Sequence, residues 1–232
     1  MQVVSTPFLF SSYEDADKLV LDPESEGYQL IEGWLAEKGV HTLGILEQGF
    51  RQLSNSKKEI VTPEDIKGMK FRVPQTAILI DAFDAMGASA SPMSFSEVYT
   101  ALQQGTIDGQ ENPLSAMVTG KFEEVQKYIT EIHYKVWIGP IVVNAAWFKK
   151  QPADVQKAIL EGGRLATENN RKMIAEMETD LVKELKDKGV EILAKPEDEP
   201  VWQEKAMGVW PQFYDKVGGK AVVDEALAIM QQ

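Results

Sequence analysis

Residues 62–87, TPEDIKGMKFRVPQTAILIDAFDAMG, hold a helix start, a short strand and a second helix in close succession. The first four residues combine an N-cap, a proline at the first helical position and early carboxylates. Residues 69–73 then read as a strand closed by Pro74. From residue 76 to residue 86 the apolar positions fall on one helical face, which ends at Gly87. This alternation predicts an α/β fold with a largely parallel sheet.

The same alternation continues on both sides of this stretch. Residues 24–38 have the pattern of a helix, and residues 40–53 read as strands with a bend, because two glycines interrupt their apolar positions. Residues 94–97, SFSE, form a capping box that opens another helix. Residues 136–143 are the most apolar stretch of the chain and predict a buried strand.

A much longer helical pattern runs from residue 153 to residue 188 and stops at Gly189. At 1.5 Å per residue it would measure roughly 50 Å, more than one compact α/β layer needs. We therefore expect a helix that braces two lobes and bends at Gly162 and Gly163. The aromatic residues of the tail, among them Trp202 and Trp210, have a spacing that favours short helices packed back on the core.

Composition excludes several classes of protein. The chain has 232 residues, of which 44% are hydrophobic, and no cysteine, so disulfide frameworks, thiolate zinc sites, iron–sulfur clusters and cysteine nucleophiles are ruled out. With only two histidines, His41 and His133, we expect no histidine metal site. A net charge of −12 argues against a general nucleic-acid surface.

Motif searches predict neither catalytic residues nor a cofactor or metal. The sequence has no G-x-S-x-G elbow, no P-loop and no G-x-G-x-x-G. It also has no apolar run of about 18 residues. Met1 leads into the chain without the basic start and apolar stretch of a secretory signal.

Two polar residues stand out as candidates. Arg72 sits inside a strand-like segment just before a proline turn, which places it at the carboxyl edge of a sheet, where ligands bind. Its planar guanidinium suits a carboxylate ligand, although a salt bridge to a nearby acid explains it equally well. Asn112 directly precedes a proline and a helix, so it is either an N-cap or a ligand contact.

These residues belong to a set of ordered motifs. They are residues 67–74 (KGMKFRVP), 86–88 (MGA), 92–103 (PMSFSEVYTALQ) and 105–113 (GTIDGQENP), with residues 6–10, 49–51 and 122–128 in support. Together they resemble the core signature of TRAP transporter substrate-binding proteins, the DctP-like solute receptors of tripartite ATP-independent periplasmic transporters. The resemblance covers essentially the whole chain.

The resemblance implies a two-lobed fold of the periplasmic binding protein type II, with a long bracing helix. We expect residues 1–48 and 138–177 in lobe I, and residues 49–137 and 178–232 in lobe II. Such a receptor is periplasmic and is not an enzyme. It would capture a small organic acid, such as a dicarboxylate, sugar acid or keto acid, and deliver it to the membrane permease of the transporter.

The resemblance also assigns roles to residues. Arg72 corresponds to the arginine that forms a bidentate salt bridge with the ligand carboxylate, and Asn112 to an asparagine that hydrogen-bonds the same group. Arg51 would be a second cationic contact and Phe95 an apolar wall. Trp137 lies near a position where family members present another ligand-facing side chain.

The chain departs from the family pattern at its beginning, where a signal peptide and roughly two βα units are missing. We therefore expect an N-terminally shortened member with an incomplete lobe I. Its uncovered sheet edge would favour dimerisation or strand exchange. Two alternatives remain: a remnant that no longer binds ligand, and an enzyme on the same scaffold that uses Arg72 as a substrate clamp.

Overall fold

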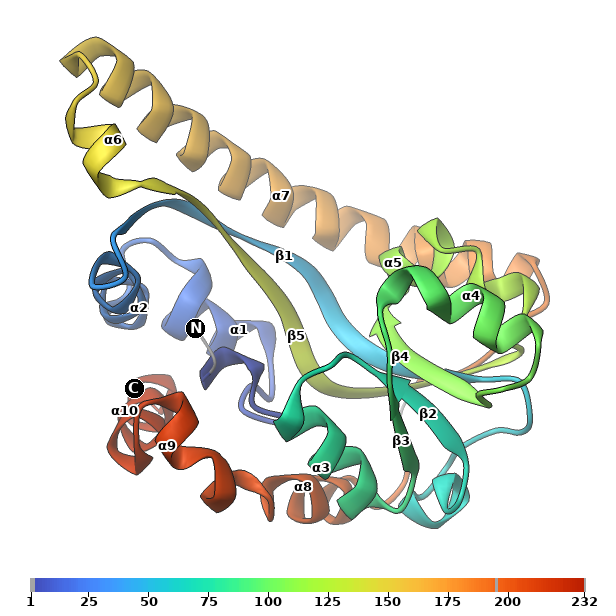
Figure 1. Ribbon diagram of the computed structural model, residues 1–232. Coiled ribbons are helices and arrows are strands. Elements are labelled where there is room, and N and C mark those ends of the chain that lie inside the picture. Colours follow the sequence, from blue (N-terminus) through green and yellow to red (C-terminus); the bar gives the residue numbers. More distant parts are fainter. Residues whose placement is uncertain (1–2, 195, 232) are drawn as a thin grey trace.

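A mixed sheet with strand order β3-β2-β4-β1-β5-β6 organises the computed structural model, which describes residues 3–194 and 196–231 (Figure 1). The strands are β1 (Val40–Asn55), β2 (Lys70–Val73), β3 (Ser89–Pro92), β4 (Gly109–Pro113), β5 (Tyr128–Asn144) and β6 (Glu191–Leu193).

Helices surround this sheet. They are α1 (Tyr13–Ala16), α2 (Glu26–Ala36), α3 (Ala77–Met86), α4 (Phe95–Gln103), α5 (Leu114–Thr119), α6 (Ala145–Lys149), α7 (Ala153–Asp187), α8 (Glu199–Met207), α9 (Tyr214–Val217) and α10 (Lys220–Met230). Single turns of other helix types are η1 (Val3–Ser5), η2 (Asp17–Leu21), η3 (Pro63–Ile66), η4 (Phe122–Glu124) and η5 (Trp210–Phe213). The elements predicted for residues 62–87 are confirmed as η3, β2 and α3.

The direction of the strands corrects the expectation of a largely parallel sheet. β2 is parallel to β3 and β4, and β5 is parallel to β6. At the centre, however, β1 is antiparallel to both β4 and β5. The β1–β5 pairing runs the whole length of both strands and shifts register three times. Such bulges increase the twist of a strand pair, and the resulting ribbon spans the molecule (Figure 1).

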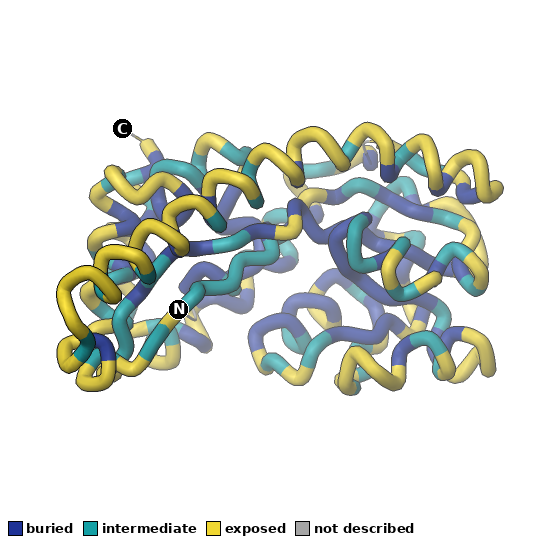
Figure 2. The backbone as a smooth tube through the Cα atoms, turned by 90° about the horizontal axis from the view of Figure 1, so that it is seen from above, coloured by how far each residue is buried: buried dark blue, intermediate teal, exposed yellow. Residues whose placement is uncertain are grey.

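The apolar stretch of residues 136–143 is a strand, as predicted, but only its beginning is buried. Val136 is fully buried, whereas Val142 is 40% exposed. Residues 137–144 are all at intermediate burial or exposed, because this half of β5 extends beyond the main core toward α6 (Figures 1 and 2). Apolar character alone did not distinguish a core strand from one with a partly open face.

Two apolar cores pack against the ribbon formed by β1 and β5. The larger core joins the N-terminal segment, β1, β2 and α3 to the C-terminal helices, and Trp202 and Trp210 are buried in it, as expected for the tail. The smaller core joins α4 and α5 to the C-terminal part of α7 through Leu181 and Leu185. The larger core contains residues from both proposed lobes, whose boundaries therefore stay a prediction.

Helix α7 confirms the predicted long helix, and the bend at Gly162 and Gly163 stays a prediction. It is continuous for 35 residues through Gly162 and Gly163. A Cβ on Gly163 would lie 2.1 Å from the carbonyl oxygen of Leu43, and a Cβ on Gly44 would lie 2.2 Å from Thr167 Oγ1. Gly163 is therefore present because the helix touches the β1 backbone directly. Among the described residues, no helix is both long and apolar enough to cross a bilayer.

Polar contacts continue the attachment of α7 to β1. The Asn170 side chain accepts a hydrogen bond from the Glu47 N–H (2.8 Å) and donates one to the Glu47 carbonyl (3.0 Å). Arg171 forms an ion pair with Asp17 and another with Glu47, at 3.3 Å. Glu47 is 2% exposed, and its Oε2 has no hydrogen-bond partner among the described residues.

Replacing Gly163 by alanine should destabilise the protein by about 2 kcal/mol or more, because the new methyl group would collide with the backbone of Leu43. Gly162→Ala is the matched control. Nothing lies within 4 Å of its Cβ position, and alanine should stabilise the exposed helix by about 0.5–1 kcal/mol. Urea unfolding of the two variants measures both effects, and equal effects would contradict the close contact.

Stability should also depend on pH through Glu47. Burial raises the pKa of Glu47 to about 7; Arg171 opposes the shift, and Asp17 and Glu178 add to it. A raised carboxyl pKa contributes stability below the unfolded value near 4.5, and this contribution is lost as pH rises through about 7. Between pH 5 and pH 7.5, the free energy of unfolding should fall by about 1–3 kcal/mol more in the wild type than in Glu47→Gln. Glu176→Gln, exposed on α7, should retain the wild-type difference.

Candidate functional site

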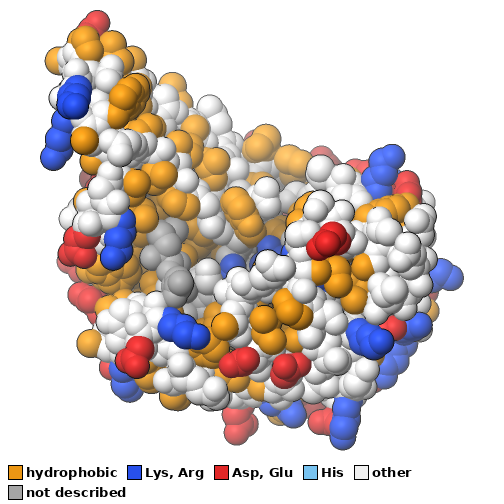
Figure 3. Space-filling view, in the orientation of Figure 1, with side chains coloured by type: hydrophobic (Ala, Val, Ile, Leu, Met, Phe, Trp, Pro, Cys, Tyr) orange, Lys and Arg blue, Asp and Glu red, His pale blue; other side chains and the backbone are white. Residues whose placement is uncertain are grey.

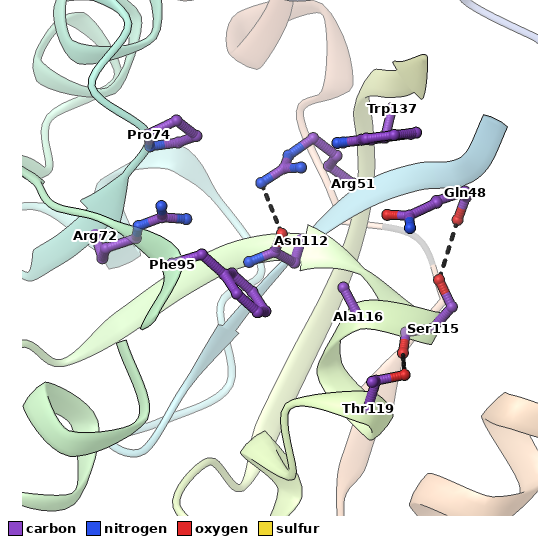
Figure 4. A pocket seen from close by; sticks show the side chains of 10 residues that line it. All are labelled: Gln48, Arg51, Arg72, Pro74, Phe95, Asn112, Ser115, Ala116, Thr119 and Trp137. Atoms are coloured by element: carbon purple, nitrogen blue, oxygen red, sulfur yellow. Dashed lines mark hydrogen bonds between the residues drawn. The ribbon is translucent and has the colours of Figure 1, made fainter. Parts of the chain in front are cut away.

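A cavity of about 420 Å³ opens where β1, β2, β4 and β5 meet the first turns of α4 and α5. The molecule is hollowed in this region, and cationic side chains are visible at the bottom of the hollow (Figure 3). The cavity brings together the five residues singled out from the sequence. Its lining is Gln48, Arg51, Arg72, Pro74, Phe95, Asn112, Ser115, Ala116, Thr119 and Trp137 (Figure 4).

Arg72 reaches the cavity from the end of β2, with its guanidinium turned toward the open space (Figure 4). The residue is 4% exposed, and its Nε and Nη2 both donate to the carbonyl of Met93, at 3.1 and 2.8 Å. No carboxylate of the described residues forms an ion pair with it, so the salt-bridge alternative is not observed. Burial lowers the pKa of Arg72, partly offset by the negative charge of Glu111. For Nη1 of Arg72, the described residues provide no hydrogen-bond acceptor.

Arg51, by contrast, already has an anionic partner. Its Nε and Nη2 contact both carboxylate oxygens of Glu111, and Nη2 also donates to the Glu111 carbonyl at 2.7 Å. The Tyr134 hydroxyl donates to the same carboxylate. Burial alone would lower the pKa of Arg51, but Glu111 more than compensates and raises it. Arg51 lines the cavity, yet most of its charge is balanced inside the protein.

Asn112 lies in β4 and is not an N-cap. The N-cap of α5 is Pro113, and no side chain caps that helix. Asn112 is 4% exposed; its Oδ1 accepts a hydrogen bond from Arg51 Nη2 at 2.9 Å and its Nδ2 donates to Gln110. The capping interpretation is therefore wrong, and the side chain is held at the cavity wall by two buried neighbours.

Two aromatic side chains flank the cationic end of the cavity from opposite sides (Figure 4). Phe95 is the first residue of α4, where Ser94 and Glu97 form the predicted capping box. Its ring remains 48% exposed, although it contacts Phe122 with ring centroids 5.7 Å apart. Trp137 comes from β5, where it pairs with Gly49. An apolar ring left open beside buried cations is suited to the carbon skeleton of a bound molecule.

Sequence reasoning missed the residues that support this site. Glu111 lies between two of the noted polar positions, and the signal was available: residues 110–112 place three polar side chains in a row inside a strand that is wholly buried. Lys135 pairs with Arg51 across the β1–β5 ribbon. Burial and then repulsion from Arg51 lower the pKa of Lys135 to about 8, against the attraction of Glu111. Three cationic side chains, those of Arg51, Arg72 and Lys135, thus lie within the electrostatic influence of one carboxylate, Glu111, in a protein whose net charge is −12.

Neither histidine lines the cavity. His41 stacks on Phe148 with ring centroids 4.4 Å apart, and His133 lies perpendicular to Phe50 with ring centroids 5.1 Å apart. Among the described residues, no three histidine or carboxylate side chains come together as metal ligands. Both histidines thus contact aromatic rings away from the cavity lining.

Known proteins resemble this chain along most of its length. The family model for DctP, described as bacterial extracellular solute-binding protein family 7, matches residues 1–217. The 2,3-diketo-L-gulonate-binding periplasmic protein YiaO of Escherichia coli is 33% identical over 83% of this chain and 58% of its own length. The C4-dicarboxylate-binding periplasmic protein DctP of Shewanella loihica is 35% identical over 98% of this chain and 67% of its own length. The chain thus spans a little over half to two thirds of these relatives.

Solved structures agree with these matches. A TRAP periplasmic solute-binding protein from Shewanella oneidensis with bound succinate has a TM-score of 0.88 and 34% identity, over 99% of this chain and 74% of that one. A Ralstonia eutropha homologue with bound (S)-2-acetolactate has a TM-score of 0.90 and 28% identity, with the same coverage. These neighbours confirm the α/β, two-lobed binding-protein fold expected from the sequence. The chain belongs to the DctP family of bacterial extracellular solute-binding proteins.

Proposed function

We propose that this protein is a periplasmic receptor that binds a small organic acid through Arg72 and passes it to a TRAP membrane permease. The observation that carries the proposal is the state of Arg72. Its guanidinium is buried and turned into a cavity, yet it has only a backbone carbonyl as partner among the described residues. Burying a charge without a counter-charge is costly, and a ligand carboxylate would supply that counter-charge in the cavity.

The remaining lining explains why small acids are the favoured class. Asn112 and the balanced Arg51 lie beside Arg72, whereas the opposite end of the cavity has only neutral polar groups, from Gln48, Ser115 and Thr119. A carboxylate at the cationic end and hydroxyl, keto or carboxyl oxygens toward the neutral end would match this arrangement. Dicarboxylates, sugar acids and keto acids all have this pattern, and a cavity of about 420 Å³ fits molecules of their size.

The position of the cavity supports capture between two lobes. Gln48 and Trp137 lie at the proposed boundaries between lobe I (residues 1–48 and 138–177) and lobe II (residues 49–137 and 178–232). Closure of the lobes would remove water from the Arg72–carboxylate pair. Because electrostatic attraction is stronger in a dry site, closure would strengthen binding and select against molecules without a carboxylate.

Two alternatives are less well supported. An enzyme that uses Arg72 as a substrate clamp would need an acid–base group, and the ten lining residues include no histidine, carboxylate or lysine. A remnant that has lost binding would have no use for a buried, unneutralised Arg72. A ligand screen distinguishes both alternatives from a receptor.

Thermal-shift screening with succinate, D-erythronate and β-D-glucuronate should identify at least one acid that raises the melting temperature of the wild type. Arg72→Ala should abolish this shift and weaken binding roughly 100-fold or more, because a charge-assisted bidentate contact is lost. Arg164→Ala is the control, since Arg164 is exposed on α7, outside the cavity, and pairs with Glu161 and Glu168. No shift with any acid would favour the remnant, and product formation would favour the enzyme.

We also propose that the protein associates with a second copy through the outer half of β5, residues 137–144. Among the described residues, β1 pairs with β4 only from Arg51 to Asn55, and β5 pairs with β6 only from Tyr128 to Thr130. Beyond Thr130, β5 therefore has an open backbone edge on the side away from β1, next to the exposed side chains of Val142 and Trp147, whereas α7 covers β1 at Leu43 and Glu47. Open, apolar strand edges favour pairing with another chain.

Light scattering should accordingly give about twice the chain mass of 25.9 kDa. Val142→Lys should shift the protein toward the monomer, because a charge beside the open edge discourages strand pairing. Met173→Lys, on the exposed face of α7, is the control and should leave the mass unchanged. A wild type that is monomeric at all concentrations would contradict the proposed association.

A further inference from the structure

A chain of buried side-chain hydrogen bonds starts at the cavity and crosses the interior of the sheet. Arg51 donates to Asn112 (2.9 Å), Asn112 donates to Gln110, Gln110 donates to Ser54 (2.7 Å), and Ser54 donates to Gln126 (3.0 Å). Gln126 in turn donates to the carbonyls of Val125 (3.0 Å) and Asp108 (3.5 Å). Each of these five side chains belongs to a residue that is at most 4% exposed.

The groups at both ends of this hydrogen-bond chain fix the donor-to-acceptor direction of every bond in it. A backbone carbonyl can only accept, so the amide nitrogen of Gln126 must face Val125 and its oxygen must face Ser54. Ser54 donates to that oxygen and is left to accept from Gln110. At the other end a guanidinium can only donate, so Asn112 must turn its oxygen toward Arg51. Flipping any one amide would place donor against donor or acceptor against acceptor, at a cost that buried groups do not tolerate.

The fixed orientation determines what Asn112 offers to the cavity. Its oxygen is occupied by Arg51, and one of its two amide hydrogens is used by Gln110. The amide nitrogen lies on the side of Arg72 and Phe95 (Figure 4), and its second hydrogen has no acceptor among the described residues. The cationic end of the cavity therefore presents donors from Arg72 and Asn112 and no acceptor between them.

We propose that Gln110, Ser54 and Gln126 are positioning residues that hold Asn112 as a hydrogen-bond donor and so make the site selective for an ionised carboxylate over its amide. The inference rests on the proposed function of the cavity. An ionised carboxylate accepts at every lone pair, whereas a primary amide would turn its NH₂ group toward one of the donors. A freely rotating Asn112 could accommodate that amide by flipping, and the hydrogen-bond chain prevents the flip.

Ser54→Ala tests this role without touching the cavity, because Ser54 is the central member of the chain and is not a lining residue. Binding is measured by calorimetry at pH 7 with succinate, D-erythronate and D-glucuronate, each compared with its primary amide. For an acid that binds the wild type, Ser54→Ala should weaken binding about 3- to 10-fold and reduce the acid-to-amide preference by a similar factor, as expected for one misoriented hydrogen bond. Ser54→Thr keeps the hydroxyl and should restore the preference.

Thr130→Val is the matched control. Thr130, like Ser54, is 1% exposed, and its hydroxyl donates to the Ile60 carbonyl at 2.8 Å. This hydroxyl does not belong to the series of hydrogen bonds that leads to Asn112. Thr130→Val should lower the melting temperature but leave the acid-to-amide preference at the wild-type value. Gln126→Met provides a second break in the chain if Ser54→Ala does not fold.

The outcomes separate this inference from the proposed function. If an acid binds the wild type and the variants lose stability but keep the wild-type preference, the hydrogen-bond chain only stabilises the fold and the inference is wrong. If none of the three acids binds the wild type, the proposed function fails, and this inference fails with it. A reduced preference in Ser54→Ala and Gln126→Met, but not in Thr130→Val, supports the positioning role.

Discussion

The antiparallel pairing of β1 with β5 is the constraint on which the rest of this structure depends. β1 carries Gly44 and Glu47, which hold α7, then Gln48 and Arg51, which line the cavity, and finally Ser54 in the buried hydrogen-bond chain. Register shifts after Thr42, Glu47 and Arg51 separate these groups along the strand. Because side chains alternate between the two faces, a slip of one residue would turn all of them to the wrong side at once. The bulges therefore fix where the site can form.

Charge is distributed unevenly in this protein, and the unevenness has a structural origin. Acidic residues dominate the chain as a whole, but the cavity is lined by Arg51 and Arg72, and behind them lie Lys135 and a single carboxylate, Glu111. Removing one partner from a buried ion pair is strongly destabilising, so Glu111 is committed to Arg51. Arg72, by contrast, has a backbone carbonyl and no carboxylate as partner among the described residues, and this difference between the two arginines underlies the proposal that Arg72 receives the ligand.

Much of this arrangement could be predicted from the sequence, and the errors have clear physical causes. Local signals such as caps, glycine stops and helical periodicity located α3, α4 and α7, and the family motifs located the five residues that share the cavity. Strand direction could not be predicted, because the 72 residues between the end of β1 and the start of β5 give no local sign of how the two strands pair. The close contact of Gly163 with Leu43 was missed because a sequence does not show what a missing side chain makes room for. Glu111 and Gln110 were passed over because their importance lies in partners far along the chain, Arg51 and Ser54.

The contact between Gly163 and the β1 backbone has a mechanical meaning. Side chains that separate a helix from a strand can change rotamer and let the two slide, but backbone against backbone leaves no such slack. With 35 residues, α7 is about 52 Å long, and the contact lies in its first third, followed by Asn170 and Arg171. Helix α7 is therefore fixed to β1 along its N-terminal half. Any displacement of the smaller core, which holds the C-terminal part of α7 at Leu181 and Leu185, must bend the helix or rotate the β1–β5 ribbon with it.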